Sequence, residues 1–119
     1  MSPHLEEQLQ RDHPGMFQEL YGDMAVTCLA WGLECQDGWY DILHSVCRQI
    51  AENGDNTIVF NQIKEKYGTL TIYYSGGTEE SEALILAAEA ASGTICEVCG
   101  TAGELSTKGW HKVRCELHK

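Results

Sequence analysis

Apolar residues recur at helical spacing in two stretches of the chain. In the first, Asp37 supplies an N-cap residue, and Asn53 with Gly54 supplies a stop. The second stretch, TEESEALILAAEAASG, carries three glutamates in its first turn, where the helix dipole favours negative charge. We therefore predict two helices, the first with one buried face. The apolar positions of that face are Trp39, Ile42, Leu43, Val46, Cys47 and Ile50.

The segment between these helices, TIVFNQIKEKYGTLTIYYSGG, has the pattern of a β-hairpin. Both halves are rich in β-branched and aromatic residues, and KEKYG supplies the turn. In the second half the side chains at 70, 72 and 74 alternate with those at 69, 71 and 73. Tyr73 and Tyr74 therefore point to opposite faces, and we expect one in the core and the other exposed.

The predicted fold class is α+β, with helices packed on a β-hairpin or small antiparallel sheet. One or two short helical pieces are expected near the N-terminus, interrupted at Pro14 and Gly15. The stretch MAVTCLAWGLECQDGW predicts no particular element. A chain of 119 residues favours one compact domain, which we divide into an acidic body of residues 1–95 and a zinc-knuckle module of residues 96–119.

The net charge is strongly acidic and unevenly spread. The chain has 18 acidic and 8 basic side chains, a formal charge of −10. Residues 1–95 hold 15 acids and 4 bases, which gives −11, and residues 96–119 hold 3 acids and 4 bases, which gives +1. An acidic body repels nucleic-acid phosphates and attracts basic surfaces.

The N-terminal sequence does not have the pattern of a signal peptide, because Glu6 and Glu7 stand where basic and apolar residues are needed. The longest apolar run, around ALILAA, is far shorter than a membrane span. We therefore expect a cytoplasmic protein with no membrane contact. In a reducing compartment its six cysteines indicate metal ligands or buried thiols rather than disulfides.

The C-terminal residues contain two pairs of metal-ligand type. Cys96 and Cys99 form the first pair, and Cys115 and His118 repeat the same spacing after 15 intervening residues. This pattern is typical of paired zinc ligands, and GELSTKGWHKVRC can fold as a hairpin that returns the chain to the metal. The sequence therefore predicts one Zn²⁺ held by these four residues.

Four protein ligands would fill a tetrahedral shell, whereas a catalytic zinc keeps one position open. No nearby glutamate stands in the pattern of a zinc-activated water, such as His-x-Glu beside a Cys-x-x-Cys. We therefore expect a structural metal, no catalytic residues and no other cofactor. His111 is a rival fourth ligand, and His118 is preferred because its spacing from Cys115 reproduces the first pair.

Other chemistry-bearing residues have plainer explanations. Cys28, Cys35 and Cys47 are spaced too irregularly for a second knuckle and are interpreted as buried thiols, with a Cys28–Cys35 disulfide or a second metal as alternatives. YYSGGTEE is interpreted as a turn, because its glutamates would repel a phosphate. An exposed polar helix face explains the set of Asp41, His44 and Arg48.

Four segments together resemble a family of small, uncharacterised bacterial and phage proteins that has the same order of motifs. They are GLECQDGWYDILHSVC, QIKEKYGTLTIYYSGG, AEAASGTICEVCG and GWHKVRCELH, and the resemblance covers roughly residues 28–118. It implies no established activity, and it supports metal binding by Cys96, Cys99, Cys115 and His118. The zinc segment itself resembles a treble-clef or zinc-ribbon knuckle, although the chain ends one residue after His118, without the long terminal helix of a full treble clef.

We expect a non-enzymatic, zinc-stabilised interaction protein, because the sequence offers no nucleophile–base pair, open metal site or cofactor loop. Its acidic body suggests a basic protein surface as the partner. By analogy, it would be a phage-linked inhibitor that occupies the groove of a nucleic-acid-handling host protein, as DNA-mimicking anti-CRISPR proteins do. The acids proposed for this face are Glu79, Glu80, Glu82, Glu89, Asp37 and Asp41.

Two alternatives stay open. The first is a nucleic-acid-binding regulator that uses the bases of the zinc module, Lys108, Lys112 and Arg114, with Trp110 among them. Direct nucleic-acid binding is the less favoured interpretation, because few bases oppose an acidic body. The second is a small enzyme whose site is built from CQDGWYDILH.

Overall fold

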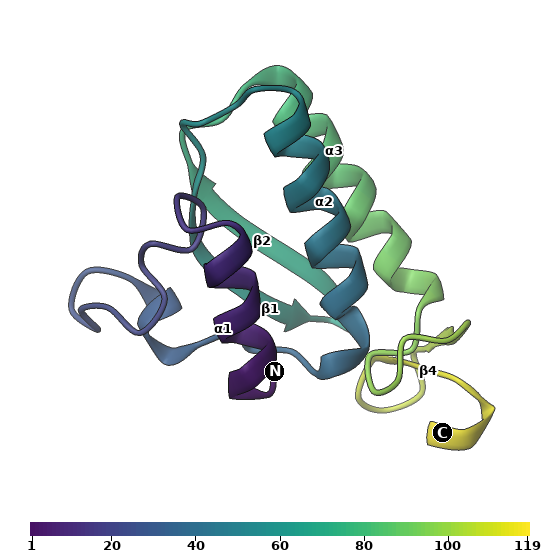
Figure 1. Ribbon diagram of the computed structural model, residues 1–119. Coiled ribbons are helices and arrows are strands. Elements are labelled where there is room, and N and C mark those ends of the chain that lie inside the picture. The colour runs from purple at the N-terminus through teal and green to yellow at the C-terminus, as the bar shows by residue number, and fades with distance from the viewer.

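The computed structural model describes residues 1–119 and confirms the α+β class (Figure 1). Helices α2 and α3 lie side by side against a two-stranded sheet, and the C-terminal segment forms a separate small hairpin beside the base of this helix pair. The regular elements are α1 (Pro3–Asp12), α2 (Tyr40–Glu52), β1 (Val59–Lys66), β2 (Thr69–Ser75), α3 (Glu79–Ala91), β3 (Glu104–Ser106) and β4 (Lys112–Arg114). None of the helices has both the length and the apolar character needed to cross a membrane.

The core lies between α2, α3 and the β1–β2 hairpin, with the N-terminal segment closing its remaining side. The periodicity that predicted α2 is confirmed, because its apolar face is buried. Of the two adjacent tyrosines, Tyr74 packs against the core and Tyr73 is exposed, as the alternation predicted. The largest fully buried side chains of the main core are Leu9, Phe17, Leu29, Trp39, Leu43, Ile50, Ile58, Phe60, Ile63, Leu70 and Ile85.

The prediction that Asp37 caps α2 is wrong. The helix begins at Tyr40, and Asp37 opens a short 3-10 turn that precedes it. The Asp37 carboxylate instead accepts a hydrogen bond of 2.7 Å from the backbone N–H of Ser2, and a second bond from the Ser2 hydroxyl. These bonds, opposed in part by burial, hold the pKa of Asp37 below its usual value.

The turn between β1 and β2 is shorter than KEKYG predicted. The strands pair up to Lys66 and Thr69, so only Tyr67 and Gly68 form the turn. Both have positive φ, +52° and +92°, which is the backbone of a type I′ hairpin turn. Glycine adopts this conformation freely, but a tyrosine in it is unusual.

Side chains of α3 and of the residue that follows it occupy the outer edge of β2. The N–H of Leu70 donates to the hydroxyl of Ser92 at 2.9 Å, and the N–H of Ile72 donates to the carboxylate of Glu89 at 2.8 Å. The backbone of Glu34 pairs with the opposite edge, on β1. Glu89 is therefore bound to the sheet, and is less available for an acidic surface than the sequence suggested.

A buried carboxylate holds the start of α3. Thr78 is the N-cap, and its hydroxyl accepts from the N–H of Ser81. The carboxylate of Asp55 accepts from the Ser81 hydroxyl at 2.5 Å, from the Thr78 N–H at 3.2 Å, and from Thr57. YYSGGTEE leads into the N-terminus of α3, where the Asp55 carboxylate already supplies a negative charge. This agrees with the interpretation of YYSGGTEE as a turn and not as a phosphate-binding loop.

Candidate metal centre

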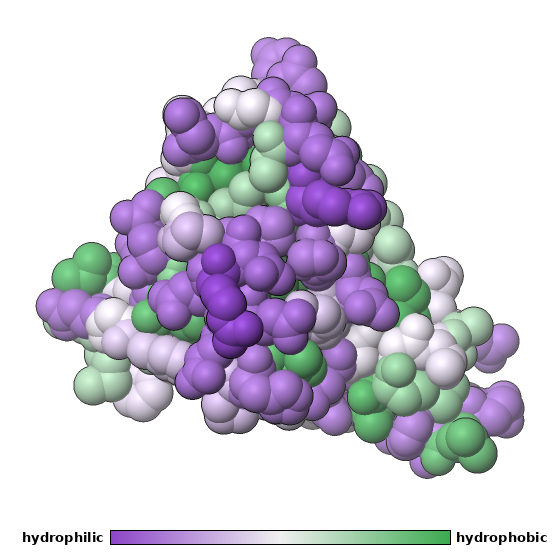
Figure 2. Space-filling view, viewed as in Figure 1, coloured by the Kyte–Doolittle hydropathy of each residue, from purple (hydrophilic) through white to green (hydrophobic).

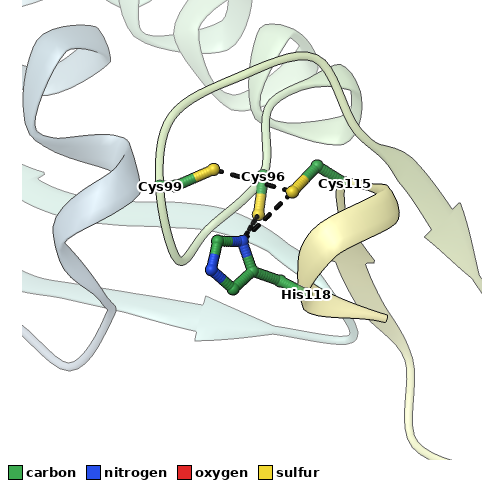
Figure 3. Close-up of side chains that lie close together, drawn as sticks. All are labelled: Cys96, Cys99, Cys115 and His118. Atoms are coloured by element: carbon green, nitrogen blue, oxygen red, sulfur yellow. Dashed lines mark hydrogen bonds between the residues drawn. The ribbon is translucent and has the colours of Figure 1, made fainter.

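The first ligand pair lies in a tight turn that follows α3. The N–H of Gly100 donates to the carbonyl of Cys96 at 2.8 Å, and the N–H of Cys96 donates to the carbonyl of Thr101 at 2.7 Å. Gly100 has φ +83°, so the turn needs glycine at this position. We call residues 96–99 the first knuckle. The turn brings the side chains of Cys96 and Cys99 toward the same point (Figure 3).

The second ligand pair is delivered by the predicted C-terminal hairpin, which the structure confirms. Strands β3 and β4 are antiparallel, with Leu105 opposite Val113. Cys115 follows β4 directly, and a single 3-10 turn at Glu116–His118 brings the histidine back over it. The N–H of His118 donates to the carbonyl of Cys115 at 3.1 Å, which closes this second turn.

The four side chains converge on one point, as Figure 3 shows. The sulfurs of Cys99 and Cys115 are 3.6 Å apart, and the Nδ1 atom of His118 lies 3.1 Å from Cys115 Sγ and 3.8 Å from Cys96 Sγ. All four donor atoms lie within 4.8 Å of one another. Sulfur and nitrogen ligands of a tetrahedral zinc are about 3.5–3.8 Å apart, given bonds of about 2.3 and 2.0 Å. The cluster could therefore bind a metal ion.

The surroundings of Cys96 favour its thiolate form. Burial raises the pKa of this thiol, but the backbone N–H groups of Cys99, Cys115 and Val98 donate to its sulfur and outweigh burial. The net result is a pKa below the usual value for cysteine. A metal ligand must be deprotonated, so these N–H groups prepare the sulfur for a cation.

In the second knuckle, residues 115–118, hydrogen bonds likewise lower the pKa of the first cysteine. Burial raises the pKa of Cys115, but hydrogen bonds from the Thr101 side chain, the Cys99 side chain and the Leu117 N–H lower it to about 7. In each pair the N–H two residues after the first cysteine donates to its sulfur, from Val98 in one pair and Leu117 in the other. Both turns thus point backbone dipoles at the metal position.

Glu97, between the two ligands of the first knuckle, ties the centre to the rest of the protein. Its side chain is only 6% exposed. Its carboxylate accepts from the N–H of Gln36 at 3.1 Å and pairs with the guanidinium of Arg114 at 3.3 Å. Its backbone carbonyl accepts from the N–H of Gly38 at 2.7 Å. Glu97 was not among the residues predicted from the sequence, although an acidic residue inside a Cys-x-x-Cys pair is a signal that could have indicated it.

The segment QDGW docks directly on this knuckle. A Cβ atom at Gly38 would lie 2.2 Å from the carbonyl oxygen of Cys96 and 2.4 Å from that of Glu97, so only glycine fits. The indole N–H of Trp39 donates to the carbonyl of Ile95 at 3.0 Å. These contacts join the start of α2 to the metal centre, and they explain the glycine in this segment.

His111, the rival ligand, lies outside the cluster. Its ring makes an edge-to-face contact with Tyr67, with centroids 6.4 Å apart. The interpretation as buried thiols is confirmed for Cys35 and Cys47 but is wrong for Cys28, which is exposed, and all three thiols are free. Burial raises the pKa of Cys35 to about 12 and also raises that of Cys47, so burial disfavours the thiolate form of both.

The predicted polar face of α2 is only partly exposed. Asp41 is exposed and Arg48 forms an ion pair with Glu52 at 3.9 Å. The ring of His44 is half-buried instead, stacked on Tyr40 at 5.9 Å between centroids. It also lies near His13, whose Nε2 atom is 3.4 Å from His44 Nδ1.

Comparisons with protein families, with curated proteins and with solved structures found no match for this chain.

Proposed function

We propose that this chain is a small, non-enzymatic nucleic-acid-binding protein whose binding face is assembled around one structural zinc ion. The donor set supports zinc: three thiolates and one imidazole are soft ligands, and a compact S₃N cluster suits a tetrahedral ion. The protein itself supplies four donors, so no position is left open for a substrate or an activated water.

The observation that carries the proposal is the segregation of positive charge in an acidic protein. Four bases line a groove beside β3 and β4, and two more line the neighbouring groove between the two hairpin turns. A third groove shares residues with both, so the three adjoin one another. Six of the eight basic residues therefore lie together, and four of the 18 acidic residues, Glu34, Glu65, Glu97 and Glu104, line the same grooves. The six bases are Lys64, Lys66, Lys108, Lys112, Arg114 and Lys119.

Four of these bases have no acidic partner. Arg114 pairs with Glu97, and Lys119 pairs with Glu116 at 2.6 Å. No carboxylate comes within ion-pair distance of the other four, although the chain has 18 acidic residues. The unpaired bases are Lys64, Lys66, Lys108 and Lys112. Unpaired bases next to exposed aromatic rings are the pattern expected of a surface that contacts phosphates and bases.

The zinc arm of the proposal is tested by metal analysis of the purified protein. We expect one zinc per chain, and we expect Cys115→Ser to lose it. Cys28→Ser is the matched control, because this thiol is exposed and outside the cluster. A folded, metal-free protein with a freely reactive Cys99 would contradict the assignment.

The binding arm is tested by fluorescence anisotropy with labelled 15-nucleotide DNA and RNA across a salt series. Each lysine–phosphate contact adds about −0.7 to the slope of log K against log salt for a single strand. The double variant Lys108→Gln, Lys112→Gln should bind more weakly and make this slope about 1.4 less negative. The control double variant Arg11→Gln, Arg48→Gln removes the same charge outside the grooves and should change little.

A second candidate function is the acidic inhibitor that would dock on a basic protein surface. Exposed carboxylates at the start of α3 favour it: Glu79, Glu80 and Glu82, with Glu52 at the adjacent end of α2. Asp41 lies at the opposite end of this helix pair, since the C-terminal end of α2 contacts the start of α3 through Asp55. This candidate therefore has a smaller acidic face than the sequence suggested.

Capture experiments separate the two candidates. An acidic inhibitor would retain a basic host protein from lysate, and the variant with glutamine at positions 79, 80 and 82 would lose it. If the wild-type chain captures such a protein and binds no oligonucleotide, the acidic candidate replaces the nucleic-acid proposal.

A further inference from the structure

Two exposed aromatic side chains border one groove from two different hairpins. Tyr67, in the β1–β2 turn, is 76% exposed, and Trp110, in the β3–β4 loop, is 81% exposed. Both line a groove of about 520 Å³ together with Lys64, Glu65, Lys66, Gly109 and His111. Large aromatic rings this exposed are unusual in a soluble domain, unless a partner covers them.

The backbone at Tyr67 supports a functional reason for its position. A type I′ turn strongly favours Asn, Asp or Gly at its first central residue, because φ must be positive. Tyr67 holds φ +52° there, although its ring makes only an edge-to-face contact with His111. A bulky residue in a disfavoured conformation, with its ring in solvent, indicates selection for the ring and not for the turn.

The zinc module fixes the distance between the two aromatic residues. The turn glycine, Gly68, lies so close to the C-terminal hairpin that a Cβ atom would be 2.7 Å from Leu105 Cδ1 and 3.1 Å from the backbone of His111. The β1–β2 turn is therefore seated on the β3–β4 loop. The groove exists only while the C-terminal hairpin is folded against it.

Basic side chains flank the rings on both sides. The ammonium of Lys66 lies 6.0 Å from the centroid of the Tyr67 ring. On the other side, Trp110 also lines the adjoining groove that contains Lys112 and Arg114. Three carboxylates, Glu34, Glu65 and Glu97, also line that adjoining groove, and Arg114 is paired with Glu97, so Lys112 is its unpaired base. The space-filling view shows the C-terminal module as a mixed hydrophobic and hydrophilic corner of the molecule (Figure 2).

We infer that this groove binds single-stranded nucleic acid, with unpaired bases stacked on Tyr67 and Trp110 and the phosphates near the flanking lysines. The inference rests on the proposed function and narrows its substrate class. Stacking on a ring needs a base whose face is free, and duplex bases do not offer one.

The test measures binding of the zinc-loaded full chain to labelled dT15, to U15, and to a 15-base-pair duplex. We expect a single strand to bind at least tenfold more tightly than the duplex. Trp110→Ala and Tyr67→Asn should each weaken single-strand binding by roughly 5- to 150-fold, the range that stacking of one base is worth. Neither variant removes a phosphate contact, so the salt slope should stay unchanged.

Two features keep these variants interpretable. Asparagine suits the backbone at residue 67, so Tyr67→Asn should fold at least as stably as the parent. Trp31→Ala is the matched control for Trp110→Ala, because Trp31 is 68% exposed and lies outside the groove. Binding by the control should equal that of the parent.

The outcomes distinguish this inference from the proposed function. Binding of dT15 or U15 that depends on both aromatic residues supports the inference, and the preferred strand identifies DNA or RNA. If the duplex binds as well as the single strand and the lysine variant weakens both, the proposed function stands and the stacking groove is rejected. Single-strand binding that is unaffected by Trp110→Ala and Tyr67→Asn also rejects it. If neither strand nor duplex binds, both proposals fail.

Discussion

Asp55 accepts most of the side-chain hydrogen bonds at the end of the helix pair where α2 ends and α3 begins. Its Oδ1 atom accepts from the N–H and the hydroxyl of Thr57, and its Oδ2 atom accepts from Thr78 and Ser81. The Ser81 and Thr57 hydroxyls do most to lower the pKa of Asp55, to about 2. A carboxylate with four donors around it stabilises the fold only while it is ionised.

Asp55→Asn should therefore lower the free energy of unfolding at neutral pH. An amide keeps one acceptor and turns an NH₂ group toward two donors, so we expect a loss of about 1.5–3 kcal/mol. Because the folded pKa lies below the ordinary value of 3.8, the carboxylate's contribution is complete above about pH 5 and is lost as the pH falls toward 2.

Denaturant unfolding of both proteins in the presence of a chelator measures this effect, because the thiol ligands would release zinc at the acidic end of the series. The difference between parent and Asp55→Asn should be constant from about pH 8 to 6 and should shrink below about pH 4. Glu80→Gln is the control, an exposed carboxylate near the start of the same helix, and should change stability by less than about 0.5 kcal/mol. A difference of similar size for both variants would contradict the role given to Asp55.

At the scale of elements, the turn before α2 contacts the first knuckle, and this contact attaches the metal centre to the main core. Gly38→Ala would place a Cβ atom 2.2 Å from the carbonyl of Cys96, and backbone must move to accept it. We expect a loss of about 1–3 kcal/mol or more, together with weaker metal retention. Gly15→Ala is the matched control, because nothing lies within 4 Å of its Cβ position and its φ is not positive.

Thermal unfolding and competition with a chelator measure both consequences of Gly38→Ala. Equal stability and equal zinc retention in Gly38→Ala and Gly15→Ala would show that the QDGW segment does not hold the knuckle. Restoration of stability by excess zinc would show that the substitution acts through the metal centre.

At the scale of the whole molecule, removal of zinc should loosen the protein unevenly. The helix pair and the β1–β2 sheet have a core of their own, which includes none of the metal ligands. We expect a chelator to release residues 96–119 first, with the two turns that contact them, at Gly38 and Gly68. Amides in the middle of α2, such as that of Val46, should keep their protection.

Hydrogen exchange with and without chelator measures this order, and returning zinc should restore the original pattern. Complete loss of helical and sheet signal in circular dichroism on chelation would mean that the metal organises the main core as well. The two-part organisation of residues 1–95 and 96–119 would then be abandoned.

The sequence predicted best those features that depend on the spacing of residues within a single element. Burial of one helix face imposes a spacing that α2 displays from Ile42 to Ile50, and a knuckle imposes the spacing of Cys96 and Cys99. It predicted least where distant segments meet. Nothing local in GLECQDGW indicates that Gly38 contacts Cys96, or that Tyr67 and Trp110 share a groove, because these contacts arise only after the hairpins pack together.

Both edges of the β1–β2 sheet form hydrogen bonds within the chain, and this affects whether two copies of the protein can associate through them. An exposed strand edge is a template on which another chain can add a strand, and such addition begins domain swapping and fibre growth. Here Ser92 and Glu89 bind N–H groups of β2, and the segment at Glu34 pairs with β1. A two-stranded sheet, which would otherwise be open on both sides, is thereby protected from self-templated aggregation. Loosening of α3 would remove that protection on the β2 side.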